Sequence, residues 1–179
     1  MKTLTLLRHA KSGWNDTVER DFDRPLNGRG RRAAERMGRY LRDESLAFDH
    51  VHASPAMRVR QTIEGVEDGY GRPLSPVFDT RIYMASSATL LDLVQGFEDG
   101  WSRVLLVGHN PGIEDLVLDC VPRDSGGFRD EVEIKYPTAT LAELVFDVDR
   151  WADVSEGGAR FVRFMRPREL DPTLGPDER

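Results

Sequence analysis

The sequence is poor in cysteine, with Cys120 alone among 179 residues. A single thiol cannot build a disulfide framework or a cysteine-based zinc site. Cysteine phosphatases place an arginine shortly after the cysteine, at the position where this chain has Gly126. The GxSxG motif of serine hydrolases and the glycine-rich P-loop are missing as well. These absences exclude thiol, serine and P-loop chemistry.

Positive charge is in the minority, with 25 Lys and Arg against 31 Asp and Glu and a formal net charge of −6. Nucleic-acid binding usually needs a basic surface, so we expect no nucleic-acid partner. Long apolar runs are missing too, and too few residues precede Arg8 for a signal peptide. We therefore expect a cytoplasmic protein with no membrane partner. The length suits one domain, which we expect to be monomeric.

Two apolar stretches each deliver a histidine at their carboxyl end. Residues 3–7 have the composition of a short buried strand and lead into Arg8-His9. Residues 101–107 have the same character and lead into His109. Ligands of open α/β sheets bind beyond the carboxyl ends of the strands. We therefore expect these two strand ends to meet at one site.

The rest of the chain alternates between helical and extended patterns. Apolar residues at helical spacing predict helices at 27–43 with Asn27 as the cap, after Pro55, at 89–97 and from Asn110 onward. Further strands are predicted at 48–53 and 75–78, and 138–147 should pair antiparallel with 160–165. This order predicts a three-layer α/β/α domain with a mostly parallel mixed sheet, over residues 1–165. We expect a mobile loop at 122–130 and a loosely ordered tail at 166–179.

Four side chains at the predicted strand ends suit phosphoryl chemistry: Arg8, His9, Arg58 and His109. Arginine binds phosphate oxygens as a planar, permanently charged fork. A neutral imidazole can attack phosphorus, and a second, protonated imidazole can stabilise the developing charge. We choose His9 as the nucleophile because the adjacent cation of Arg8 lowers its pKa. From chemistry alone, His109 remains the alternative nucleophile.

These motifs resemble those of the histidine phosphatase superfamily. The three main segments are Arg8-His9, Ser54-Pro55-x-x-Arg58-x-x-Gln61-Thr62 and Gly108-His109-Asn110-Pro111. Other features are similar to the small SixA-type branch of phosphohistidine phosphatases: Arg8-His9-Ala10-Lys11-Ser12, Asp23-Arg24-Pro25-Leu26 followed by Gly30, Tyr83, and Tyr136-Pro137-Thr138. The resemblance extends from Leu4 to about Met165, nearly the whole chain.

The resemblance implies a phosphoglycerate mutase-like fold and a phosphatase that works without a metal or other cofactor. It implies that His9 is transiently phosphorylated and that Arg8, Arg58 and His109 line the phosphate pocket. The expected partner is a phosphorylated substrate, foremost a protein that carries phosphohistidine. Two alternatives stay open: a small-molecule phosphomonoesterase or mutase on the same fold, and a binding module for phosphate or phosphopeptides without turnover.

The sequence departs from the family pattern at two points. Ala10 follows the first histidine, where the superfamily usually has glycine. Residues 78–85 contain no glutamate that could serve as a general acid, and Asp79, the nearest carboxylate there, could be structural. An alkoxide leaving group needs a proton donor, whereas a phosphohistidine or an anhydride has a better leaving group. The missing glutamate therefore favours phosphohistidine-type substrates.

Several other polar residues have both a functional and a structural interpretation. Lys11, Ser12 and Asn15 either touch the substrate or are ordinary loop residues. His50 and His52 share one face of a predicted strand, a spacing found in metal sites and more often in structural pairs. The arginine-rich segment 29–42 is interpreted as a solvated helix face, with a docking face for an acidic partner as the alternative.

Overall fold

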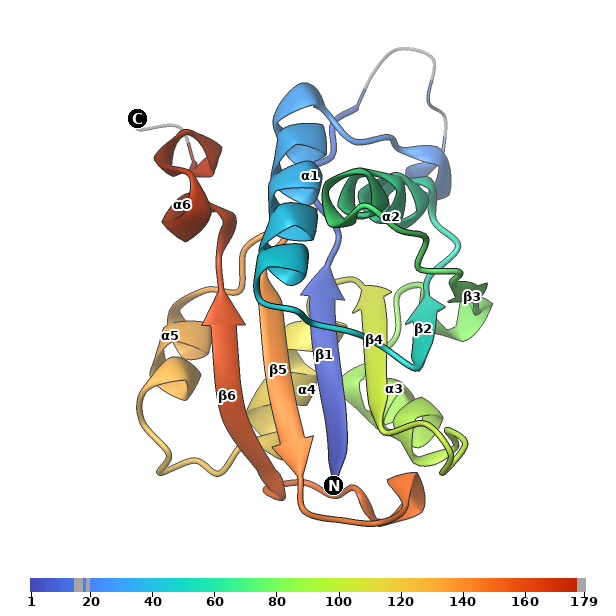
Figure 1. Cartoon of the computed structure of the whole chain (residues 1–179), viewed down its shortest axis with the longest axis vertical. Helices are drawn as coiled ribbons and strands as arrows, with labels where there is room; N and C mark the ends of the chain where they lie inside the picture. Colours follow the sequence, from blue (N-terminus) through green and yellow to red (C-terminus); the bar gives the residue numbers. More distant parts are fainter. Residues whose placement is uncertain (15–17, 19, 177–179) are drawn as a thin grey trace.

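The computed structural model describes residues 1–14, 18 and 20–176. Within this part of the chain, six strands form one sheet in the order β3-β2-β4-β1-β5-β6 (Figure 1). Their bounds are β1 Lys2–Arg8, β2 His50–Ala53, β3 Val77–Phe78, β4 Arg103–Gly108, β5 Leu141–Phe146 and β6 Ala159–Met165. Strands β1 to β4 are mutually parallel, and β5 and β6 run antiparallel at one side. The predicted mixed sheet and its late antiparallel pair are confirmed.

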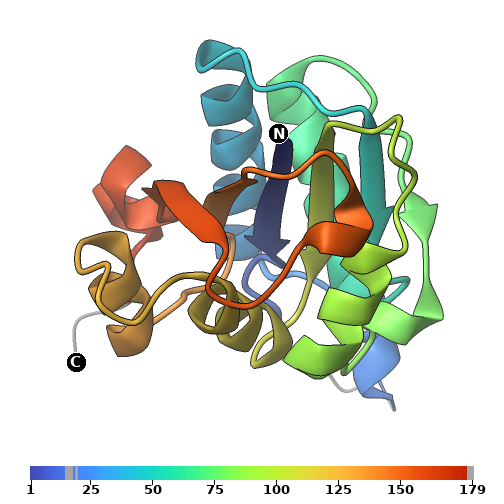
Figure 2. The same cartoon turned by 90° about the horizontal axis from the view of Figure 1, so that it is seen from below.

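Helices cover both faces of the sheet, as Figures 1 and 2 show from two directions. Helices α1 (Gly28–Asp43) and α2 (Met57–Tyr70) lie on one face, with α6 (Pro167–Leu170) beside α1. Helices α3 (Ser87–Gln95), α4 (Gly112–Cys120) and α5 (Phe128–Ile134) lie on the other face. The arrangement is the predicted three-layer α/β/α architecture.

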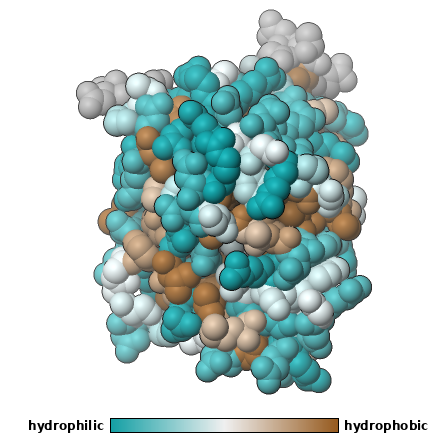
Figure 3. Space-filling view, viewed as in Figure 1, coloured by the Kyte–Doolittle hydropathy of each residue, from teal (hydrophilic) through white to brown (hydrophobic). Residues whose placement is uncertain are grey.

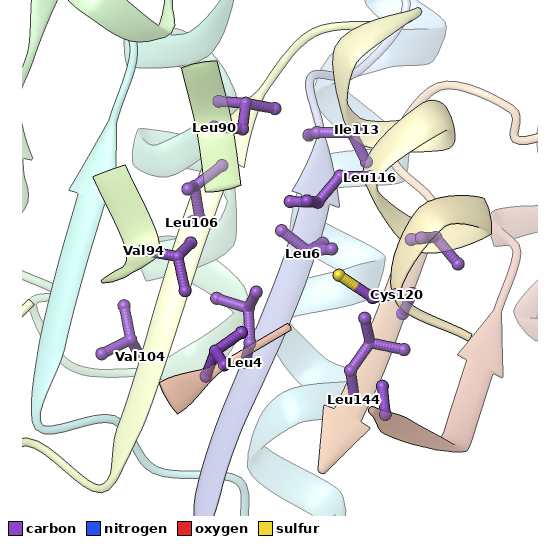
Figure 4. Close-up of a cluster of buried hydrophobic side chains, with 14 of the residues drawn as sticks. Leu4, Leu6, Leu90, Val94, Val104, Leu106, Ile113, Leu116, Cys120 and Leu144 are labelled. Atoms are coloured by element: carbon purple, nitrogen blue, oxygen red, sulfur yellow. The ribbon is translucent and has the colours of Figure 1, made fainter. Parts of the chain in front are cut away.

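Alternation along the central strands divides the core into two halves. Leu4 and Leu6 point to the side of α3 and α4, where they pack with Leu106 (Figure 4). Leu7 and Val107 point to the opposite side and pack with residues of α1 and α2. Because both faces are covered, the central strands are apolar on both sides. This double burial fixes the positions at which β1 and β4 end.

Cys120 lies in the first of these halves, at the end of α4 (Figure 4). Its side chain is fully buried, and burial raises the pKa of its thiol to about 12. A thiol of this kind stays protonated at neutral pH and is unreactive. Cys120 is therefore an inert residue of the core.

Helix α1 has the predicted cap, and apolar residues at helical spacing form one buried stripe along it. The Asn27 side chain accepts a hydrogen bond from the Gly30 backbone N–H, which satisfies one of the free donors of the first turn. The stripe consists of Ala33, Ala34, Met37 and Leu41, all buried. Arginines cover much of the outward side, and Figure 3 shows a strongly hydrophilic surface over this helix.

Two segments are more ordered than the sequence indicated. Helix α5 begins at Phe128, inside the segment 122–130 that was expected to be a mobile loop. The tail after Arg166 was expected to be loose, but it forms α6 and a 3-10 turn at Pro172–Leu174. Glu169 accepts from the Arg166 backbone N–H at 2.8 Å, and Leu174 is buried against the α1 side of the core. Tertiary contacts order both segments, through Arg129 and the buried Val132 in α5 and through Leu174 in the tail, where the Glu169 cap adds to them.

No helix in residues 1–14, 18 and 20–176 is long and apolar enough to cross a membrane.

Candidate active site

The register of β1 and β4 brings the two histidines together. Arg8 pairs with Gly108 across the parallel strands, so His9 and His109 leave the sheet side by side. The His9 backbone N–H donates to the Gly108 carbonyl at 3.0 Å, and the two imidazole centroids are 5.3 Å apart. The expectation that these strand ends meet is confirmed by the strand pairing itself.

His9 is held in one tautomer by the chain that follows it. Its Nδ1 lies 2.8 Å from the Ala10 carbonyl oxygen. A carbonyl only accepts, so Nδ1 carries the proton and Nε2 presents a lone pair. Ala10 is fully buried, and its N–H donates to the Thr62 hydroxyl at 2.9 Å. The alanine that replaces the usual glycine therefore fits, and it anchors the carbonyl that orients His9.

His109 is oriented by the serine that follows β2. Its Nε2 lies 2.8 Å from the Ser54 hydroxyl oxygen, which also accepts from the Ala56 backbone N–H at 3.3 Å. The Ser54 hydroxyl can donate to Nε2 or accept from it, so this contact holds the ring in place without fixing its tautomer. The other ring nitrogen, Nδ1, is buried and has no hydrogen-bond partner among the described residues.

Helix α2 carries Arg58 into the site and holds the neighbouring loop. The Thr62 hydroxyl donates to the Arg58 carbonyl at 2.6 Å, and Gln61 accepts from the Leu26 backbone N–H at 2.8 Å. The residues of the segment from Ser54 to Thr62 therefore each have a structural role in the site. One end orients an imidazole, the middle supplies a guanidinium, and the other end fixes the loops on both sides of the site.

Several buried nitrogen atoms of the site have no hydrogen-bond partner in the part of the chain that the structure describes. They are Arg8 Nε, Arg24 Nε, Arg58 Nε and His109 Nδ1. Buried polar groups are nearly always satisfied, so a cluster of unpaired donors needs an explanation. The charges of Arg8, Arg24 and Arg58 all act on His109, so the four side chains lie in one region. This arrangement suits a bound oxyanion.

A carboxylate that the sequence did not single out also lies in the site. Asp21 Oδ2 accepts from Arg58 at 3.0 Å and from the Tyr83 hydroxyl at 2.6 Å, and Oδ1 accepts from Arg24 at 3.0 Å. Partial burial acts to raise the pKa of Asp21, but hydrogen bonds from Tyr83, Arg24 and Arg58 and the charge of Arg58 outweigh it. The pKa falls to about 2. Asp21 is therefore ionised at neutral pH.

The site keeps both histidines neutral. Burial is the main cause that lowers the pKa of His9 to about 3, and the charges of His109, Arg8 and Arg58 add to it. Burial and the charge of Arg58 lower the pKa of His109 to about 4. The charge of Arg8, from which the sequence predicts a low pKa for His9, does lower this pKa, but burial lowers it more. The protonated His109 that the sequence suggested does not match its low pKa.

The chain is similar to a known family model and to several known proteins. The model of the histidine phosphatase superfamily, branch 1, matches residues 4–82. A putative phosphohistidine phosphatase SixA from Nakamurella multipartitia is 32% identical, with a TM-score of 0.79 over 93% of this chain and 96% of that one. The corresponding Agrobacterium tumefaciens structure is 30% identical, with a TM-score of 0.78 over 93% and 98%. An uncharacterized Mycobacterium tuberculosis protein is 35% identical and covers 90% of this chain and all of its own length.

The chain belongs to the histidine phosphatase superfamily. Within it, the chain is of the SixA type, and its fold is that of the phosphoglycerate mutase-like histidine phosphatases. It is a phosphatase that works through histidine, as this membership supports.

The other residues that the sequence offered as site candidates in this histidine phosphatase have different surroundings. The Ser12 hydroxyl accepts from Arg24 at 2.6 Å, so it positions a cation of the site. Lys11 lines a neighbouring groove, whereas Asn15 lies outside the described residues. Asp79 is bound by Arg81 and His52, an arrangement that lowers its pKa, and it caps a short 3-10 turn. Asp79 is therefore structural.

His50 and His52 form a structural chain and not a metal site. His50 Nε2 lies 2.9 Å from His52 Nδ1, and His52 Nε2 lies 2.9 Å from Asp79 Oδ2. His50 also stacks on Trp101 with ring centroids 3.8 Å apart. In residues 1–14, 18 and 20–176 there is no group of three or more His, Cys, Asp or Glu that could hold a metal ion.

The neutral histidines give a prediction for titration. In a buffer free of phosphate and other oxyanions, NMR of the imidazole nitrogens should show His9 and His109 neutral at pH 6, with protonation only toward pH 3 and 4. The unfolded chain takes up these protons near pH 6.5, so the stability that the neutral rings contribute is complete above 6.5 and is lost as the pH falls toward the folded-state values.

The variants His9→Ala and His109→Ala assign the two signals. A midpoint near 6.5 for either ring would contradict the desolvated site.

Proposed function

We propose that this histidine phosphatase hydrolyses phosphohistidine on a protein, through a covalent phosphohistidine at His9 and without a metal. The observation that carries the proposal is the fixed tautomer of His9. Its Nδ1 is committed to the Ala10 carbonyl, so Nε2 is the free nitrogen, and unpaired N–H donors surround the same site. A nucleophile and an oxyanion cradle are the two parts that phosphoryl transfer requires.

The first step forms a bond between His9 Nε2 and phosphorus. The bond from phosphorus to the substrate's ring nitrogen breaks, and its electron pair stays on the leaving ring. That ring can take a proton at its other nitrogen, remote from the broken bond, and depart as neutral imidazole. In the second step water attacks phosphorus, the bond to Nε2 breaks, and orthophosphate and free His9 result.

The unpaired donors provide contacts for the oxygens of the phosphoryl group. Arg8 and Arg58 supply permanent charge and an unpaired Nε group each, and His109, in the tautomer protonated on Nδ1, supplies a neutral donor. Their positions are fixed independently of the substrate, since Arg8 also donates to the Tyr136 carbonyl at 2.9 Å and His109 is bound to Ser54. Preorganised donors of this kind stabilise the charge of the transition state without reorganisation.

The choice of substrate class rests on proton donors. Asp21 is ionised, and its Oδ2 already accepts the Tyr83 proton. Burial and Asp21 both raise the pKa of Tyr83, so its hydroxyl is a poor acid. Neither group can supply a proton to an alkoxide leaving group, which has no second site for protonation. A phosphorylated imidazole avoids this difficulty, and the site therefore favours it over phosphomonoesters.

The nucleophile is tested by His9→Ala. Turnover should fall by roughly 10³-fold or more, because the variant lacks the nucleophile that forms the proposed covalent intermediate. Steady-state kinetics measure the loss, and circular dichroism with thermal unfolding confirms that the variant folds. His50→Ala is the matched control, since His50 pairs with Val104, far from the end of β4, and its loss should leave kcat close to wild type. Substantial turnover by folded His9→Ala would sink the proposed mechanism.

The substrate class is tested with a panel. A phosphohistidine protein, a phosphoserine peptide and simple phosphomonoesters are compared by kcat/KM, with and without a chelator. We expect the phosphohistidine protein to exceed the esters by at least about tenfold, since one missing protonation step costs on the order of 10²-fold. The chelator should have no effect. Equal or better ester turnover would indicate the phosphomonoesterase alternative, and phosphate binding without any turnover would indicate a binding module.

A further inference from the structure

A groove of about 220 Å³ lies beside the phosphate site, lined by residues of the N-terminal half of α1 and of α6. The two helices are neighbours in Figure 1. Arg8 lines the groove and also belongs to the phosphate site, so the two adjoin at the end of β1. Gly30 lets α1 approach the loop after His9, because a Cβ there would lie 2.1 Å from the Lys11 carbonyl oxygen. The groove is therefore a fixed part of the fold next to the reaction centre.

The lining of the groove is unusual for an acidic protein. None of the residues that the structure places in its wall is Asp or Glu. Its cations are Arg8, Lys11, Arg29, Lys135, Arg166 and Arg168. Against a net charge of −6 for the whole chain, this is a local concentration of positive charge. Such a groove attracts anions and repels cations at distances up to about the Debye length of 8–10 Å.

The cations differ in how far they are already neutralised. Arg166 donates to Glu131 at 3.3 Å and to Glu169 at 2.9 Å, so its charge is partly compensated. Lys135 and Arg168 are exposed and form no ion pair with any described residue. The charge of Arg168 also acts on the neighbouring Glu169, whose pKa it helps to lower, but both side chains can reach a ligand in the groove. Long, exposed side chains suit contacts with mobile carboxylates, whereas a phosphate cradle is built from fixed, convergent donors.

Apolar groups accompany this charge in the groove and around the site. The groove wall includes Ala33, Pro137, Pro167, Leu174 and Pro176. Trp14, Met84 and Ile134 are large apolar side chains that are 61%, 78% and 86% exposed. Each belongs to a segment that also supplies a residue of the site. Arg24 lies over the Trp14 ring, Tyr83 precedes Met84, and the Tyr136 carbonyl near Ile134 holds Arg8.

We propose that this basic groove binds acidic side chains that flank the phosphohistidine of a protein substrate. The inference rests on the proposed function and adds a sequence preference to it. The phosphoryl group occupies the site at His9, and carboxylates of the same polypeptide lie in the groove beyond Arg8. Lys135 and Arg168 then determine specificity for the surroundings of the phosphohistidine and take no part in the chemical steps.

The experiment compares two phosphohistidine peptides of equal length, one with Asp and Glu and one with Ala and Gly around the phosphohistidine. Wild-type protein should hydrolyse the acidic peptide with roughly tenfold higher kcat/KM at low salt, mainly through KM, and the preference should shrink as salt screens the charges. The double variant Lys135→Glu/Arg168→Glu should lose the preference. Its turnover of the neutral peptide and of phenyl phosphate should stay within about twofold of wild type.

The control is Arg103→Glu, which changes an exposed arginine at the start of β4, the end of the sheet opposite the site. It should keep the preference for the acidic peptide. Equal hydrolysis of both peptides by wild type would overturn the proposed role of the groove and leave the proposed function standing. A preference that survives in the double variant would also overturn it. Turnover of phenyl phosphate without turnover of either peptide would overturn the proposed function and the groove together.

Discussion

The parallel register of β1 and β4 is the constraint on which the rest of the site depends. Because Arg8 faces Gly108, the next residue on each strand is a histidine, and the His9 N–H closes onto the Gly108 carbonyl. The strands cannot slip, since Leu4 and Leu6 face one half of the core and Leu7 the other. The core therefore sets the distance between two imidazoles that are a hundred residues apart in the chain.

The same burial that fixes the histidines also sets their protonation. Desolvation lowers both imidazole pKa values, and Arg8 and Arg58 act in the same direction. An acidic chain thus assembles a local cationic site by gathering a few arginines at the strand ends, while Asp21 balances Arg24 and Arg58. A neutral nucleophile and strong oxyanion donors can coexist only in such a desolvated, preorganised place.

The sequence predicted those parts of the site that depend on strand ends. Arg8, His9 and His109 follow apolar stretches directly, and Asn27 is recognisable as a cap. Asp21 could not be predicted, because its place depends on a loop that folds back onto Arg58 and Tyr83. Helices α5 and α6 were missed because they are short, and tertiary contacts and the link between Arg166 and Glu169 stabilise them where periodicity is weak. Local patterns carry no information about such contacts.

The central claim is that His9 Nε2 carries the phosphoryl group during turnover. The most direct measurement mixes the protein with radiolabelled substrate, quenches within milliseconds, and determines the stability and position of the label. The account predicts a phosphoenzyme that survives alkali, is lost in acid, and maps to the peptide that contains His9. A label that survives acid, or one that maps to His109, would contradict it.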